Sequence, residues 1–231
     1  LASVYKNAVK KANRSNPDWV DLNSVQVTGT NQLLVSSQAL SSIFKINNVN
    51  SLLPKIDYII ADKSIWKDYK NLKKKVLTKA LEGEATPGPE ETPVVDSILD
   101  TPKEKKELFN SQAGQNSVVY SRTSSLAEGQ YYLTMLNNNS GVKATRSGKS
   151  YYYKFLVDET ARTYALSETK SFDQTKDEGN ITKANNVYVY CNAGGNKFTE
   201  SDSSGKLIKE FSVKKGLYRI YKDTWKDFWF K

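Results

Sequence analysis

The chain has 231 residues and a formal net charge of +9, and its 38% hydrophobic and 11% aromatic content excludes a wholly disordered chain. It contains no histidine and one cysteine, which excludes imidazole acid–base catalysis, an internal disulfide and the usual structural zinc sites. We therefore expect no metal and no cofactor. No stretch approaches the about 18 apolar residues of a membrane-spanning helix, so we expect no membrane span.

Residues 1–81 are predicted to form a basic region that mixes helices and strands. Apolar side chains at helical spacing predict an amphipathic helix over residues 1–14. Runs of β-favouring residues predict strands over residues 32–37 and 55–61. A second apolar stripe at helical spacing predicts a longer helix over residues 63–81, whose opposite face is basic. The basic-face candidates are Lys70, Lys73, Lys74, Lys75 and Lys79.

Residues 82–116 have a different composition. Proline, glycine and glutamate dominate residues 82–93, which is typical of an acidic linker or an exposed loop. Two short helical pieces are predicted after it, before the composition changes again near residue 116. We expect this segment to separate a mixed region at 1–81 from a second domain at 117–231.

Residues 117–231 contain most of the tyrosines and no proline, as expected for a continuous sheet. Short β-favouring runs separated by Asn-, Ser- and Gly-rich turns predict an antiparallel meander, folded as a sandwich or a partly open barrel. The runs are 118–122, 130–136, 142–145, 150–157, 162–166, 186–192, 207–213 and 217–222. The predicted fold class is therefore α+β, with a helix-containing N-terminal part followed by an antiparallel β-meander.

Aromatic side chains are the positive signal in this second region. Strand alternation places Tyr151, Tyr153, Phe155 and Val157 on one face and Tyr152 on the other, so both faces are partly aromatic. Two interpretations stay open: a two-layer core with tyrosines at its rim, or a recognition surface, since tyrosine is enriched at interfaces. The interface or ligand candidates are Tyr152, Tyr188, Tyr190, Tyr218, Tyr221, Trp225 and Trp229.

Candidate catalytic residues are few. Ser42 and Lys45 match the Ser-x-x-Lys spacing in which a lysine can activate a serine nucleophile, but the companion motifs of that chemistry are missing. A hydrolase that uses such a pair, or two carboxylates, is therefore the third hypothesis. Cys191 lies in a predicted strand, and we expect it to be an inert, half-buried side chain.

The leading hypothesis is a non-enzymatic structural or recognition protein, a subunit of a surface appendage, coat or virion that acts through protein contacts and self-assembly. A helix leading into a meander resembles, in layout alone, the headpiece of pilin-like subunits. The alternative is a lysine-rich electrostatic binder of nucleic acid or another polyanion. The low cysteine and methionine content and the polar turns favour an extracytoplasmic location, at a cell surface or in a virion.

Overall fold

The fold is known from a computed structural model, which describes residues 20–61, 66–79, 115–137, 150–172, 179–192 and 195–222. Strands make up 59% of these residues and helix only 3%, and the strands form three antiparallel sheets. The predicted α+β class is therefore wrong: the described part of the chain is almost entirely β. The helix predicted over residues 1–14 lies outside the described residues.

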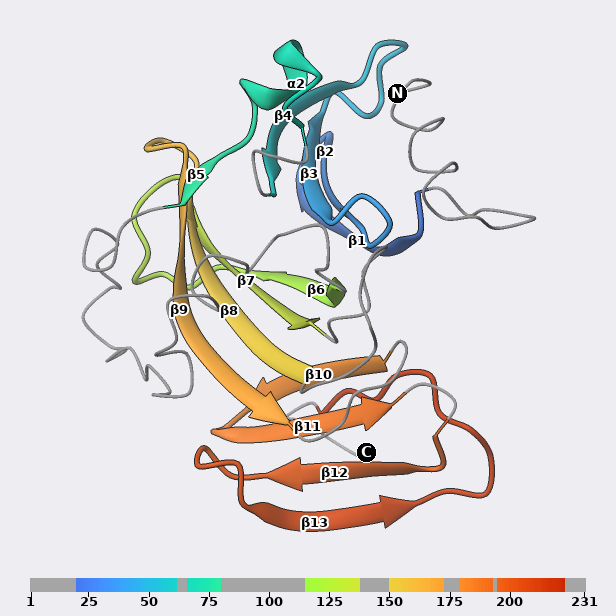
Figure 1. The fold of residues 1–231 in the computed structure, drawn as a ribbon. Coiled ribbons are helices and arrows are strands. Elements are labelled where there is room, and N and C mark those ends of the chain that lie inside the picture. The colour runs from blue at the N-terminus through green and yellow to red at the C-terminus, as the bar shows by residue number, and fades with distance from the viewer. Residues whose placement is uncertain are drawn as a thin grey trace, which may run out of the picture. The chain divides into compact units, whose positions relative to one another are not determined.

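The first sheet is a four-stranded antiparallel meander in chain order. Its strands are β1 (Leu22–Gly29), β2 (Gln32–Ser37), β3 (Ser42–Asn47) and β4 (Lys55–Ile60), and Figure 1 shows them in blue to teal. Tight turns join β1 to β2 and β2 to β3, and a longer loop joins β3 to β4. Asn31, Ser41 and Asn48 adopt positive φ angles in these connections. Asparagine tolerates that conformation better than most residues, which explains why the turns are rich in it.

The second sheet has the order β5-β9-β8-β7-β6. Its strands β6 (Gln115–Ser121), β7 (Gln130–Asn137), β8 (Ser150–Asp158) and β9 (Thr163–Phe172) pair antiparallel, whereas the two-residue β5 (Thr78–Lys79) pairs parallel with β9. Long runs of apolar and aromatic residues in β7 and β8 bury both faces of these strands. Such double burial is typical of strands at the centre of a layered fold.

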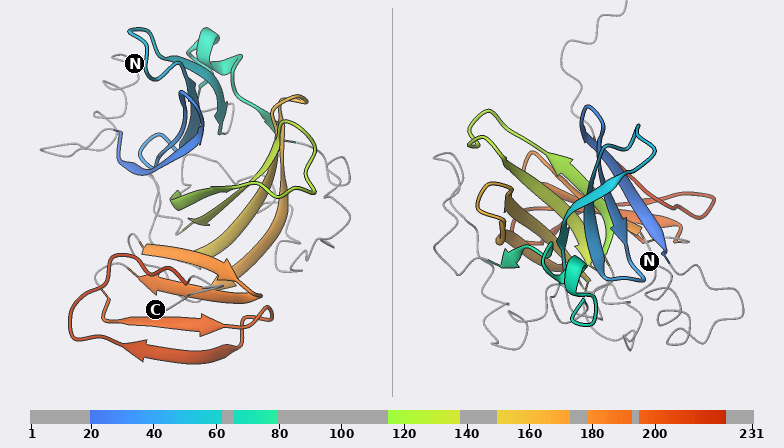
Figure 2. Two further views of the ribbon diagram at one scale, coloured as in Figure 1. Left: turned by 180° about the vertical axis from the view of Figure 1, so that it is seen from behind. Right: turned by 90° about the horizontal axis from the view of Figure 1, so that it is seen from above.

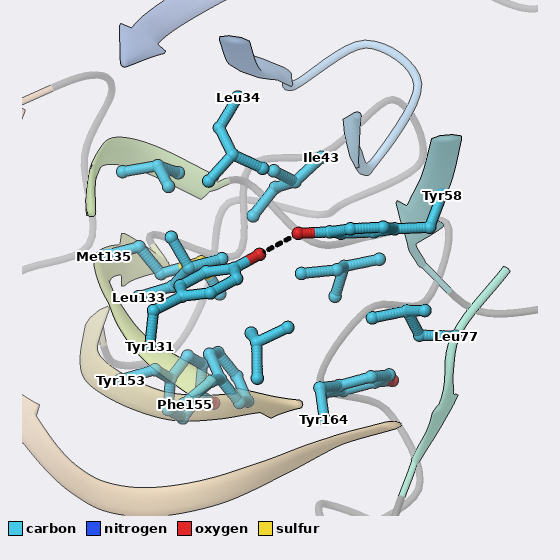
Figure 3. Packing of buried hydrophobic residues seen from close by; sticks show 13 residues of the cluster. Leu34, Ile43, Tyr58, Leu77, Tyr131, Leu133, Met135, Tyr153, Phe155 and Tyr164 are labelled. Atoms are coloured by element: carbon cyan, nitrogen blue, oxygen red, sulfur yellow. Dashed lines mark hydrogen bonds between the residues drawn. The ribbon is translucent and has the colours of Figure 1, made fainter. Parts of the chain in front are cut away.

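These two sheets lie side by side and are linked at both edges (Figure 2). At one edge Ser24 and Asn23 of β1 donate side-chain hydrogen bonds to backbone carbonyls of β6. At the other edge Ile59 of β4 bridges to Val76, and Thr78 then donates to the carbonyl of Arg162 beside β9. The inner faces enclose a buried cluster that includes Leu34, Ile43, Tyr58, Tyr131 and Phe155 (Figure 3).

The long helix predicted over residues 63–81 is wrong for the described part of that segment. Only α2 (Lys70–Lys73) is helical, and the chain then extends through Val76 into β5. The reason is tertiary: the Ile59 N–H donates to the Lys75 carbonyl, and its own carbonyl accepts from Leu77. These sheet-like bonds, together with burial of Val76 and Leu77, override the helical spacing of the side chains.

The third sheet forms a separate meander of four antiparallel strands. It contains β10 (Gly179–Ala184), β11 (Val187–Asn192), β12 (Lys197–Ser201) and β13 (Leu207–Ser212). Its buried residues come from β11 and from the start of β10, whereas β13 is largely exposed. The segment predicted as a strand over residues 217–222 is irregular, and Asn180 of β10 holds it through hydrogen bonds with the backbone of Ile220.

The chain divides into two compact units, residues 1–175 with the first two sheets and residues 176–231 with the third. The predicted linker lies almost wholly outside the described residues, so the three-region division made from the sequence stays a prediction. Within the residues that the structure describes, no helix has the length and apolar character needed to cross a membrane.

Candidate functional site

A pocket of about 500 Å³ opens where the first two sheets meet, entirely within the first unit. Its walls come from β1 to β3, from β6 and β7 with the loop between them, and from the turn between β8 and β9. The lining residues are Thr28, Gln32, Lys45, Tyr120, Arg122, Glu128, Gly129, Gln130, Tyr131, Glu159 and Thr160. Two cations, two carboxylates and two phenols thus meet in one concave site, as in many ligand-binding pockets.

Lys45 is the buried cation of this pocket. Strand alternation turns it and Ile43 toward the second sheet, and only 4% of its side chain is exposed. Its ammonium lies 3.2 Å from the Glu159 carboxylate and donates a 2.8 Å hydrogen bond to the Thr28 hydroxyl. A lysine is rarely buried without such partners, so this pair fixes the turn between β8 and β9 against the first sheet.

Two buried tyrosines extend this network into the core. The Tyr58 hydroxyl donates to Glu159 at 2.8 Å and shares a hydrogen bond with the Tyr131 hydroxyl (Figure 3). Burial raises the pKa of both phenols far above the ordinary value, and for Tyr58 the neighbouring Tyr131 and Glu159 raise it further. Both side chains are therefore neutral near pH 7 and act as hydrogen-bonding groups, not as phenolates.

The other two charged groups of the pocket are exposed and have no counter-ion among the described residues. Arg122 follows β6 and makes one long hydrogen bond, 3.4 Å, to the carbonyl of Ala127. Glu128 stands in the loop between β6 and β7, where its side chain is open to solvent. Beside them, the rings of Tyr120 and Tyr131 lie 4.9 Å apart at a 44° tilt and form an aromatic wall.

Gly129 holds the two loops of the pocket together. Its φ angle is +80°, and a Cβ atom placed there would lie 2.8 Å from the Thr160 hydroxyl. Its carbonyl accepts a 3.0 Å hydrogen bond from the N–H of Glu159. Only glycine combines that backbone conformation with so close an approach, so the residue is needed to bring Glu128 and Glu159 to one site.

The aromatic candidates from the sequence fall into three groups. Tyr152, Tyr188 and Tyr190 are buried, with 2 to 3% exposure, which favours the core interpretation for them. Tyr218 and Tyr221 are more than half exposed. They belong to the second unit, whereas all the residues that line the pocket belong to the first. The two tryptophan candidates, Trp225 and Trp229, lie outside the described residues.

The lysine candidates do not form one face of a helix. Lys70, Lys73 and Lys74 are exposed around the single turn of α2, and Lys75 is partly buried next to the bridge at Val76. Lys79 belongs to β5. Lys70, Lys73, Lys74 and Lys75 do not line the pocket.

The Ser42–Lys45 spacing does not create a catalytic pair. Residues three apart in a strand point to opposite faces of the sheet. Ser42 is buried on the face opposite to Lys45, where its hydroxyl accepts a 3.1 Å hydrogen bond from the buried Trp66 indole. Lys45 faces inward, to the pocket. Cys191 is fully buried, not half-buried as expected, and burial raises the pKa of its thiol. The described residues contain no cluster of three or more metal-ligating side chains.

Sequence reasoning missed Arg122, Glu128 and Glu159. Each stands in or beside a turn, where charged residues are usual, so no local pattern distinguishes them from solvated loop residues. The sequence drew attention to Lys45 only through its Ser-x-x-Lys spacing with Ser42, which predicted a catalytic pair and not the ion pair with Glu159.

In a comparison with protein families, the family model "Arylsulfotransferase (ASST)" matches residues 3–201. No curated protein matches the chain. The match covers most of the chain and names an enzyme family, so the expectation of a non-enzymatic structural protein of an appendage, coat or virion was wrong. The resemblance to pilin-like headpieces fails with it, and the match gives no support to the alternative of a polyanion binder. An extracytoplasmic location is compatible with this family.

Proposed function

Because the chain belongs to the arylsulfotransferase family, we propose that it transfers a sulfuryl group from an aryl sulfate to a phenol in the pocket beside Lys45. The observation that carries the proposal is one pocket that combines an aromatic wall, a carboxylate held by buried partners, and a guanidinium without a counter-ion in the described residues. We further propose that the enzyme acts at the cell surface.

The donor sulfate would bind at the cationic side of the pocket. A sulfate monoester carries one negative charge, and the planar guanidinium of Arg122 can donate two parallel hydrogen bonds to its oxygens. The ammonium of Lys45 adds a second positive charge nearby, although Glu159 already compensates it. The aryl ring would pack against Tyr120 and Tyr131, whose faces are large and amphipathic.

Glu159 is the group best placed to accept a proton. Within these 231 residues no imidazole is present, and the neutral phenols of Tyr58 and Tyr131 are poor bases, so a carboxylate takes that role. Glu159 lines the pocket, and its hydrogen bond from Tyr58 and ion pair with Lys45 fix its orientation. The high pKa of both phenols also argues against a tyrosine nucleophile, which favours direct transfer between the two substrates.

The reaction then balances without a further reactant. The acceptor hydroxyl loses its proton to Glu159 while its oxygen attacks sulfur, and the bond between sulfur and the donor oxygen breaks. The donor leaves as a phenolate, which takes the proton back from Glu159. Arg122 and Lys45 stabilise the sulfuryl oxygens throughout the transfer, because both positive charges line the pocket in which negative charge concentrates on that group.

The test uses 4-nitrophenyl sulfate as donor and phenol as acceptor, with release of 4-nitrophenolate and formation of phenyl sulfate as the two readouts. Glu159→Gln should lower kcat by about 10²-fold or more, which is the usual contribution of a general base. Arg122→Gln should lower kcat/KM by about 10- to 100-fold, the value of a hydrogen bond to a charged group.

Lys55→Gln is the matched control for charge, because Lys55 is exposed at the start of β4 and does not line the pocket. Its activity should equal that of the unchanged chain. The proposal is wrong if the unchanged chain forms no phenyl sulfate, or if Glu159→Gln retains full activity. Release of 4-nitrophenolate that does not depend on phenol would indicate hydrolysis and would also contradict it.

A further inference from the structure

The charges of the pocket point to one class of acceptor. Among the lining residues, the positive charges are those of Lys45 and Arg122 and the negative charges are those of Glu128 and Glu159. The pocket is therefore neutral when empty, and one bound sulfate monoester makes it negative. An acceptor that carries a positive charge would restore neutrality.

Glu128 is the group that would recognise this charge. Lys45 already compensates Glu159 at 3.2 Å, whereas Glu128 has no counter-ion in the described part of the chain. Glu128 precedes Gly129, whose close approach to Thr160 brings this loop into the lining of the pocket. A cation entering with the acceptor would meet an exposed, uncompensated carboxylate there.

The aromatic wall supports the same choice. Tyr120 and the largely buried Tyr131 line the pocket, and aromatic rings attract cations as well as other aromatic rings. Lys45 itself lies 6.0 Å from the centre of the Tyr131 ring, so this wall already borders one ammonium group. In a phenol with an ammonium group on a short side chain, the ring can pack against the aromatic wall while the ammonium pairs with the Glu128 carboxylate.

We infer that the preferred acceptors of this pocket are phenols that bear a cationic amine, and that Glu128 is the residue that selects them. The inference rests on the proposed sulfuryl transfer and adds the class of acceptor to it. It assigns Glu128 to substrate recognition through charge, a role separate from the proton transfer at Glu159.

The experiment compares two acceptors of similar size, tyramine with its ammonium group and 4-ethylphenol without one, using 4-nitrophenyl sulfate as donor. The quantity measured is the ratio of kcat/KM for tyramine to that for 4-ethylphenol. In the unchanged chain this ratio should exceed one. Glu128→Gln should lower it by about two- to fivefold, the range expected for one exposed ion pair, and Glu128→Lys should lower it further because like charges repel.

Glu210→Gln is the matched control, since Glu210 is an exposed glutamate of β13 that does not line the pocket. It should leave the ratio unchanged, and thermal melting should show that all variants fold. A ratio that is the same in the unchanged chain and in Glu128→Lys would overturn the inference and leave the proposed transfer standing. If neither acceptor is sulfated by the unchanged chain, the proposed function itself fails, and the inference fails with it.

Discussion

Replacing Tyr58 with phenylalanine tests whether the network below the pocket stabilises the first unit. The side chain is completely buried, and its hydroxyl contacts Glu159 at 2.8 Å and the Tyr131 hydroxyl. A hydrogen bond to a charged group contributes about 1.5–3 kcal/mol and a neutral one about 1 kcal/mol. Because the Glu159 side chain is 33% exposed, water can replace part of the hydrogen bond from Tyr58. The lower end of the range for a hydrogen bond to a charged group therefore applies.

Tyr58→Phe should therefore lower the free energy of unfolding by about 2–3 kcal/mol, because the Tyr131 hydroxyl also loses its partner in a buried position. For a chain of this size, that corresponds to a decrease in Tm of about 4–12 °C, measured by scanning calorimetry. Tyr221→Phe is the control, since its ring is 54% exposed. Adding Tyr131→Phe to the Tyr58→Phe variant should lower the free energy of unfolding little further, because it removes the buried hydroxyl that has lost its hydrogen-bond partner.

Equal melting temperatures for Tyr58→Phe and Tyr221→Phe would refute this reasoning. Such a result would mean that water or rearranged neighbours satisfy Glu159 and Tyr131 without Tyr58. A double variant much less stable than Tyr58→Phe alone would instead show that Tyr131 contributes through packing and not through this hydrogen bond.

The same buried phenols and the Gly129 turn can be tested in two further ways. Since burial raises the pKa of Tyr58 and Tyr131 above the ordinary value of about 10, their contribution to stability should be complete below about pH 10 and should decrease as the pH rises further. An ultraviolet titration should accordingly show these two phenols ionising only as the chain unfolds, and ionisation of all tyrosines in the folded chain near pH 10 would contradict this. Gly129→Ala should lower stability by about 1–3 kcal/mol through backbone strain and the contact with Thr160, and should impair sulfuryl transfer more than Gly205→Ala, which has a similar φ angle but lies outside the pocket. Equal activity of these two variants would argue against a role for the Gly129 turn in shaping the site.

The sequence alone determined most of the strands, because alternation and turn residues are local properties. The runs predicted at 32–37, 130–136 and 150–157 coincide with β2, β7 and β8 to within a residue or two. The alternation in β8 also placed Tyr153, Phe155 and Val157 on one face correctly, since they share the inner core of the first unit. These predictions succeeded because the period of two in a strand requires no knowledge of its partners.

Only the tertiary structure determined the conformation of residues 66–79 and the location of the pocket. The helical spacing in that segment was real, but backbone bonds between Ile59 and its partners at Lys75 and Leu77 gave it an extended end. The pocket likewise joins Lys45 to Glu159, which are far apart in the chain and stand in a strand and a turn of ordinary composition. Local pattern cannot reveal such pairs, because their energy depends on which strands pair and which side chains become buried together.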